Sequence, residues 1–170
     1  MNTSTVKLYS LSYRDIRTYL VAASFIAGNI LLPQLCHAIP NGGATFLPIY
    51  FFTLVAAYKF GWKAGLLTAI LSPLANTLLF GMPLVSALPV IMIKSVLLAS
   101  AAGYAAWRFN KLSLPIIAGV VLSYQIAGGI LELIYTGSLA AAIQDLRIGL
   151  PGILVQIIGG YFLIRYLLKK

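Results

Sequence analysis

Charged residues are scarce in this sequence, and acidic residues are the scarcest. Only 9% of its 170 residues are charged and 61% are hydrophobic, whereas a soluble domain carries about 25% charged residues. One cysteine excludes an intramolecular disulfide and any site built from several cysteines, and one histidine excludes the HExxH type of metal site. So little charge predicts a protein whose surface faces lipid.

Motifs for nucleotide binding and catalysis are also missing. The sequence has no glycine-lysine loop of the kind that holds ATP phosphates. Its three acidic residues are Asp15, Glu132 and Asp145, and no nucleophile has an oriented base beside it. Cys36 and His37 are adjacent, and neighbours rarely turn toward each other as a catalytic pair. We expect no enzyme, no metal site and no cofactor, although His37 stays open as a haem or corrin ligand.

Long apolar runs, separated by clusters of glycine, proline and asparagine, make up most of the chain. A helix needs about 20 apolar residues to cross a bilayer. The second run is short, and Pro48 near its start predicts an irregular beginning, while the loop 137–148 has room for a short helix. We predict an all-α integral membrane protein with a single domain, residues 1–170, folded as a compact bundle of six transmembrane helices at about 16–35, 45–60, 63–83, 87–108, 113–136 and 149–167.

Basic residues predict the orientation of this bundle. If six spans alternate, Arg147 is the one basic residue in the outer loops. Positively charged residues concentrate in cytoplasmic loops, so both termini should be cytoplasmic. The net charge of +9 is then a topology signal and not a nucleic-acid signal, and the start of the chain belongs to the first span and not to a cleaved signal peptide. The predicted cytoplasmic basic residues are Lys7, Arg14, Arg17, Lys59, Lys63, Arg108, Lys111, Arg165, Lys169 and Lys170.

Four polar side chains on four predicted helices fall at similar depth in the outer half of the membrane. Counted at 1.5 Å per residue, Asn76, Lys94 and Gln156 lie about 10 Å below the outer helix ends, and Glu132 lies about 6 Å below. A lysine in hydrocarbon costs about 2.5–3.5 kcal/mol, so these side chains should face the bundle interior. We predict that they line a binding site there.

Alternatives for these residues stay open. Lys94 and Glu132 either form a buried ion pair that fixes helix packing or contact a polar ligand, and both can hold if the pair forms in the empty state. A third possibility is that Lys94 extends toward the outer interface. Asn76 and Gln156 are as well suited to hydrogen bonds between helices. Lys94 would suit a carboxylate or phosphate and Glu132 an amine, so the substrate is not identified.

The outer loops supply further candidates. His37 and Asn41 lie in the first outer loop, and Tyr50 offers an aromatic ring for stacking, as do Phe46 and Tyr135. A loop histidine without a role is the alternative for His37.

Small residues on the first span predict a docking surface. Ala23 and Ala27 are four residues apart, with Gly28 beside them, and this spacing lets another helix approach closely. Packing within the bundle is the alternative.

These features together resemble the substrate-binding S component of an energy-coupling factor (ECF) transporter. The resemblance rests on six short spans, the alanine pair of the first helix, and the stretch "FLPIYFFTLVAAYKFGWKAGLLTAILSPLANTLLFGMP", and it covers roughly residues 14–168. It implies a vitamin or similar micronutrient bound near the outer face, with Asn76, Lys94, Glu132 and Gln156 near the pocket. It also implies that Ala23 and Ala27 dock on a transmembrane coupling subunit that carries two ATPases.

The expected function is therefore that of a high-affinity, substrate-binding subunit of an ATP-driven importer, multi-pass in a bacterial cytoplasmic membrane. Its expected partners are a vitamin-like small molecule, the coupling subunit with its two ATPase subunits, and the lipid bilayer. The alternative is a self-sufficient small oligomeric transporter or channel, which would not need the alanine pair.

Overall fold

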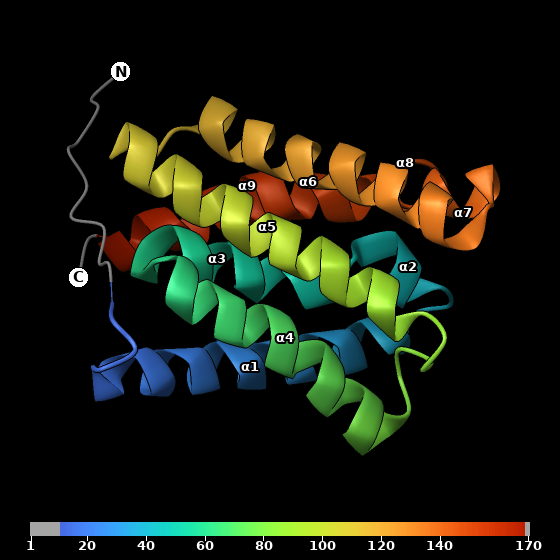
Figure 1. Ribbon diagram of the computed structural model, residues 1–170, viewed down its shortest axis with the longest axis horizontal. Helices are drawn as coiled ribbons and strands as arrows, with labels where there is room; N and C mark the ends of the chain where they lie inside the picture. The colour runs from blue at the N-terminus through green and yellow to red at the C-terminus, as the bar shows by residue number, and fades with distance from the viewer. Residues whose placement is uncertain (1–10, 169–170) are drawn as a thin grey trace.

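The computed structural model describes residues 11–168, and every regular element in that range is a helix (Figure 1). Five helices are long and apolar enough to cross a membrane. This confirms the all-α class, and the architecture is that of a multi-pass membrane protein. These helices are α1 (Ile16–His37), α4 (Trp62–Phe80), α5 (Leu88–Phe109), α6 (Leu114–Thr136) and α9 (Leu150–Leu168).

The predicted second span is broken at its start. α2 (Gly42–Phe46) and a single 3-10 turn, η1 (Pro48–Tyr50), precede α3 (Phe51–Phe60). Leu47 joins them in a left-handed conformation, with φ of 47°, and Pro48 has no N–H to continue a helix. The irregular beginning expected at Pro48 is confirmed. Pro48–Phe60 is a shorter apolar segment than the five long helices, so a sixth crossing stays a prediction.

α3 forms the centre of the bundle. It contacts α1, α4, α5 and α9, and its residues 53–59 are all buried. A helix that is apolar on all sides is stable only when other elements surround it. Leu54 and Tyr58 of α3 are fully buried and pack in one hydrophobic cluster with Leu98 and Ile117. The centre of the bundle is therefore filled with side chains.

Glycine permits two close approaches between these elements. A Cβ atom on Gly103 of α5 would lie 2.9 Å from the Cα of Trp62, at the start of α4. A Cβ atom on Gly152 of α9 would lie 2.4 Å from the carbonyl carbon of Phe46 in α2. Both distances are too short for a side chain, so the absence of a Cβ atom at these two positions lets the backbones approach each other.

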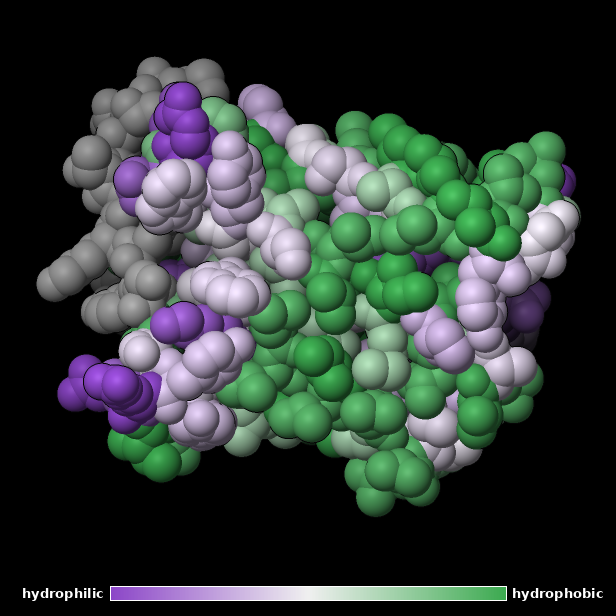
Figure 2. Space-filling view, viewed as in Figure 1, coloured by the Kyte–Doolittle hydropathy of each residue, from purple (hydrophilic) through white to green (hydrophobic). Residues whose placement is uncertain are grey.

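Basic residues gather at the end of the bundle where α1 begins and α5 and α9 end (Figure 1), here called the basic end. The Tyr58 hydroxyl donates to the Lys111 carbonyl at 2.8 Å, and Lys63 Nζ lies 5.3 Å from the centre of the Tyr13 ring. Figure 2 shows hydrophilic residues at this end and an apolar band across the middle. The basic end contains Arg14, Arg17, Lys59, Lys63, Arg108, Lys111 and Arg165, whereas Lys7, Lys169 and Lys170 lie outside the described residues.

Two exposed tryptophans flank the same end. Trp62 begins α4 and Trp107 lies two residues before the end of α5, with exposed fractions of 48% and 71%. Tryptophan is enriched where a membrane meets water, so these two side chains suit an interface at the basic end.

The opposite end is here called the cavity end. It is built from α2, the connection between α4 and α5, and two short helices, α7 (Leu139–Ala142) and α8 (Gln144–Arg147). The short helix expected in the loop 137–148 is therefore present, as two separate turns.

Candidate functional site

A cavity of about 440 Å³ lies at the cavity end, and we call it the ionic compartment. Its charged lining residues are Lys94 of α5, Glu132 of α6 and Asp145 of α8. The remainder of the wall is largely apolar, with Tyr50 from η1 and Thr136 and Gln144 as further polar groups. Four separate elements thus contribute polar side chains to one space.

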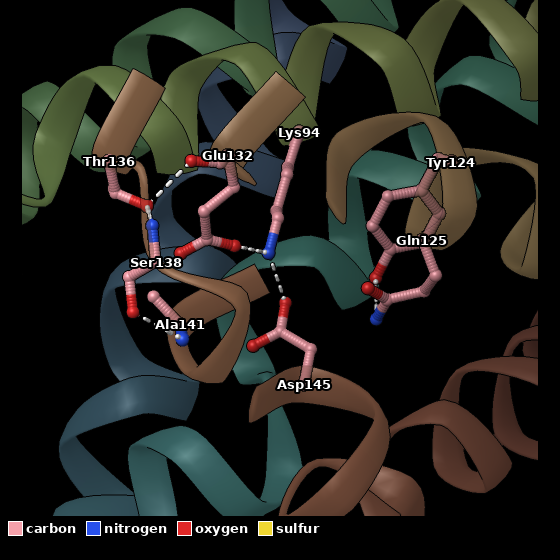
Figure 3. Close-up of polar contacts among 8 residues, drawn as sticks. All are labelled: Lys94, Tyr124, Gln125, Glu132, Thr136, Ser138, Ala141 and Asp145. Atoms are coloured by element: carbon pink, nitrogen blue, oxygen red, sulfur yellow. Dashed lines mark hydrogen bonds and ion pairs between the residues drawn. The ribbon is translucent and has the colours of Figure 1, made fainter. Parts of the chain in front are cut away.

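Lys94 bridges the two carboxylates of this compartment (Figure 3). Its Nζ donates to Glu132 Oε2 at 2.5 Å and to Asp145 Oδ2 at 2.8 Å. The lysine side chain is 3% exposed, and the two carboxylates are 16% and 17% exposed. Pairing offsets part of the cost of burying an ammonium group. The ion pair that was one of the alternatives for Lys94 and Glu132 is therefore present, with Asp145 as a third member.

A glycine on the neighbouring helix makes room for Lys94. A Cβ atom on Gly128 of α6 would lie 2.6 Å from Lys94 Cγ and 3.3 Å from its Cε. Because no side chain occupies that space, the stem of Lys94 runs along α6 toward Glu132, one turn further along the same helix. The face of α6 that carries Gly128 and Glu132 thus holds the lysine in position.

A short capped turn brings Asp145 back over Lys94. α6 ends at Gly137, which has a φ of 65° that favours glycine. Ser138 then caps α7, because its Oγ accepts a hydrogen bond from Ala141 N at 3.3 Å. The Thr136 hydroxyl joins both parts, donating to the Glu132 carbonyl at 2.7 Å and accepting from Ser138 N at 3.2 Å. These bonds fold α7 and α8 against the mouth of the cavity.

A second cavity of about 440 Å³ adjoins the first, and we call it the apolar compartment. Its wall contains Pro33, Met82 and Leu84, with His37 and Asn76 as its polar side chains. Both compartments have five lining residues in common: Gly43, Ala44, Ile49, Ala87 and Ile91. The two compartments therefore meet at these five residues.

Asn76 belongs to a hydrogen-bonded group at the junction of α1, α3 and α4. Its Nδ2 donates to the carbonyls of Asn29 at 2.9 Å and Ser72 at 3.0 Å. The Asn29 amide in turn donates to Thr53 Oγ1 and Ser72 Oγ, and its Oδ1 accepts from Phe52 N at 3.2 Å. Asn76 Oδ1 is buried with no hydrogen-bond donor among the described residues. One acceptor in the wall of the apolar compartment is thus left free.

Gln156 belongs to a different polar group. The Tyr124 hydroxyl donates to Gln156 Oε1 at 2.8 Å and accepts from Gln125 Nε2 at 3.1 Å. The Tyr124 ring also lies 5.5 Å from the Tyr50 ring, centre to centre, and Tyr50 lines the ionic compartment. Gln156 therefore supports the wall of that compartment through two tyrosines and does not line it.

The structure brings together only part of the predicted site. Asn76, Lys94 and Gln156 are buried, as expected from the cost of exposing them to lipid, and Glu132 is half-buried. They belong to three separate hydrogen-bonded groups. His37 is exposed and lines the apolar compartment, while Asn41 is exposed at the start of α2 and lines neither compartment.

The predicted docking pair lies on the outer surface of the bundle. Ala23 and Ala27 of α1 are both exposed. Gly28 instead faces inward, because a Cβ atom there would lie 2.8 Å from the ring of Phe52. The exposed surface of α1 continues above and below the alanine pair with large apolar side chains, Leu20 and Leu31.

Three participants were missed from the sequence: Asp145, Asn29 and Tyr124. Asp145 carried a usable signal, because it is the second acidic residue, with Glu132, on the predicted outer side. Asn29 also carried one, since an asparagine within an apolar span needs an internal partner. Tyr124 gave no such signal, because tyrosine is common in apolar helices.

Among the described residues, no group of three or more His, Cys, Asp or Glu side chains is arranged to hold a metal ion. The polar groups present suit hydrogen bonding and ion pairing with a small molecule. The chain matches no family model, no curated protein and no solved structure.

Proposed function

We propose that this chain is the substrate-binding membrane subunit of an ATP-driven importer of the ECF type, which binds a vitamin-like micronutrient from outside the cell. The observation that carries the proposal is the pair of adjoining compartments at the cavity end, with the Lys94–Glu132–Asp145 group in one wall. Cavities of several hundred Å³ with a few convergent polar groups are typical of small-molecule sites.

The charge distribution supports an outward-facing cavity. The basic end carries seven described lysines and arginines (Arg14, Arg17, Lys59, Lys63, Arg108, Lys111 and Arg165), whereas the cavity end carries Arg147 at its surface and the buried Lys94. By the positive-inside rule, the basic end faces the cytoplasm, and both termini with it. In this topology Pro48–Phe60 completes six crossings of a bacterial cytoplasmic membrane.

The filled centre favours binding over conduction. Leu54, Tyr58 and Ile117 are fully buried and occupy the bundle between the cavity and the basic end. A self-sufficient channel would need a path through this region, whereas a binding subunit needs only the cavity. The chain also lacks a nucleotide-binding loop, so its energy would come from partner subunits that contain the ATPases.

Bound small molecules test the binding role directly. The protein purified in mild detergent from cells grown in rich medium should release a small organic molecule, identified by mass spectrometry. Ala44 lines both compartments, so the bulky side chain of the variant Ala44→Trp should occupy the binding space. This variant should release none of the small molecule. Equal amounts from both proteins, or none from either, would contradict a binding subunit.

Exposed Ala23 and Ala27 test the docking role. Replacing both with leucine should abolish uptake with the coupling and ATPase subunits present, because added bulk keeps two helix backbones apart. Ligand binding to the isolated protein should stay within about twofold, because neither alanine lines a compartment. The matched control is Gly119→Leu on α6, where a Cβ atom meets nothing within 4 Å. Unchanged uptake in the alanine double variant would favour the self-sufficient transporter.

A further inference from the structure

The ionic compartment has an excess of negative charge. Its charged lining residues are one lysine and two carboxylates. The Lys94 ammonium group donates to both carboxylates, at 2.5 Å to Glu132 and 2.8 Å to Asp145, and its side chain is 3% exposed. A ligand in the cavity therefore meets the two carboxylates before it can reach the lysine.

Each carboxylate keeps one oxygen free for a ligand. Glu132 binds Lys94 through Oε2 and Asp145 binds it through Oδ2. No hydrogen-bond donor in the described residues 11–168 reaches the other oxygen of either side chain, and both side chains stay partly exposed, at 16% and 17%. Two negatively charged side chains that line the cavity, one from α6 and one from α8, thus each have an oxygen without a hydrogen bond from the described residues.

The apolar compartment is lined mainly by hydrophobic side chains. Asn76 is 1% exposed and its Oδ1 has no donor. The orientation of its amide is fixed, because Nδ2 meets two carbonyl oxygens, which accept and cannot donate. Asn76 Oδ1 has almost no accessible surface, so a ligand in this compartment contacts the apolar wall and not this oxygen.

We infer that the substrate is an organic cation: a positively charged nitrogen with N–H donors, attached to an apolar body. The nitrogen binds the second oxygens of Glu132 and Asp145, while Lys94 keeps the first, and the body lies in the apolar compartment against Met82 and Leu84. An anionic substrate is disfavoured, because it would have to displace two carboxylates from Lys94. This inference rests on the proposed function and names the chemical class of its substrate.

The experiment identifies and rebinds the molecule that the purified protein releases. The expected molecule carries a basic nitrogen, and Asp145→Asn weakens its binding at least tenfold, since a charge-assisted hydrogen bond is lost. The matched control is Asp15→Asn, the same chemical change at the basic end, where Asp15 caps α1; its affinity should match the parent. Thermal unfolding of each variant confirms that it is folded.

A second measurement uses three probes of similar size: phenethylammonium, phenethyl alcohol and hydrocinnamate. The cation should displace the released molecule at the lowest concentration. In the double variant Glu132→Gln with Asp145→Asn, Lys94 is left without a carboxylate, and hydrocinnamate should bind most tightly of the three probes when each is titrated directly.

The outcomes separate the two proposals. A released molecule without a basic nitrogen, or hydrocinnamate as the best competitor for the parent, overturns the cation class and leaves the binding subunit standing. No released molecule and no probe that binds overturns both.

Discussion

Lys94 is the residue on which the cavity end depends. It connects α5 to α6 through Glu132 and to α8 through Asp145. A lysine with two partners responds to mutation differently from one with a single partner, because removal of either carboxylate still leaves it paired. The third member therefore changes what mutations of this group should do.

We expect Lys94→Met to be the most destabilising change in the group, by about 3–5 kcal/mol, because it leaves two carboxylates close together without a counter-charge. Glu132→Gln and Asp145→Asn should each cost less, because Lys94 keeps one carboxylate partner. The variant that combines all three changes should recover most of the stability that Lys94→Met loses. Unfolding in detergent, followed by circular dichroism, gives these values. A loss for Glu132→Gln as large as that for Lys94→Met would mean that Asp145 does not share the lysine.

Gly128 and Gly119 form a matched pair on α6. Gly128→Ala places a Cβ atom 2.6 Å from Lys94 Cγ, whereas Gly119→Ala meets nothing within 4 Å. Gly128→Ala should destabilise by about 1–3 kcal/mol through overpacking and weaken ligand binding by displacing Lys94. Gly119→Ala should be neutral or slightly stabilising, since alanine favours helices. The same unfolding and binding measurements apply to both, and equal effects would rule out the contact with Lys94.

At the scale of elements, α1 and α4 secure the broken start of α3. The first N–H groups of any helix have no acceptor within that helix. Phe52 N lies in the first turn of α3 and donates to Asn29 Oδ1 of α1 at 3.2 Å. Asn29 also donates to Thr53 of α3 and Ser72 of α4, so one side chain caps a helix and joins three.

Asn29→Ala should therefore destabilise the protein by about 1–3 kcal/mol, because it leaves buried polar groups unpaired. The control is Ser24→Ala on the same helix, where the exposed hydroxyl bonds only to Leu20 O one turn before it. Hydrogen exchange should quicken at the start of α3 in the asparagine variant and not in the serine variant. An unchanged rate of hydrogen exchange at Phe52 N–H in Asn29→Ala would show that Asn29 does not cap α3.

The sequence predicted where the helices lie along the chain better than it predicted which polar side chains meet between them. Apolar runs and turn residues predicted the helices, and Pro48 predicted the irregular start of α3. Counting residues gave the position of Asn76, Lys94 and Gln156 along their helices. It did not predict which neighbouring side chains each of them contacts. Packing separates Asn76 and Gln156 into two other groups, and the Thr136–Ser138 turn, invisible to periodicity, brings Asp145 to Lys94.

For the whole molecule, the charge asymmetry between its ends predicts a topology. We expect cysteines at Asn41 and Arg147, in a Cys36→Ser background, to react with a membrane-impermeant maleimide applied to intact cells. Both side chains are exposed at the cavity end. A cysteine at Lys111, exposed at the basic end, should react only after the membrane is opened. The reverse pattern would invert the protein and place the cavity in the cytoplasm.

The position of the two tryptophans has an optical consequence. Trp62 and Trp107 are the only tryptophans in the sequence, and both flank the basic end, at the far side of the bundle from the two compartments. Their emission should report contact with lipid or with a partner subunit, and it should barely change when the cavity is occupied. Tyr50 lines the ionic compartment, so Tyr50→Trp would move the reporter to the site, and fluorescence could then follow the arrival of ligand.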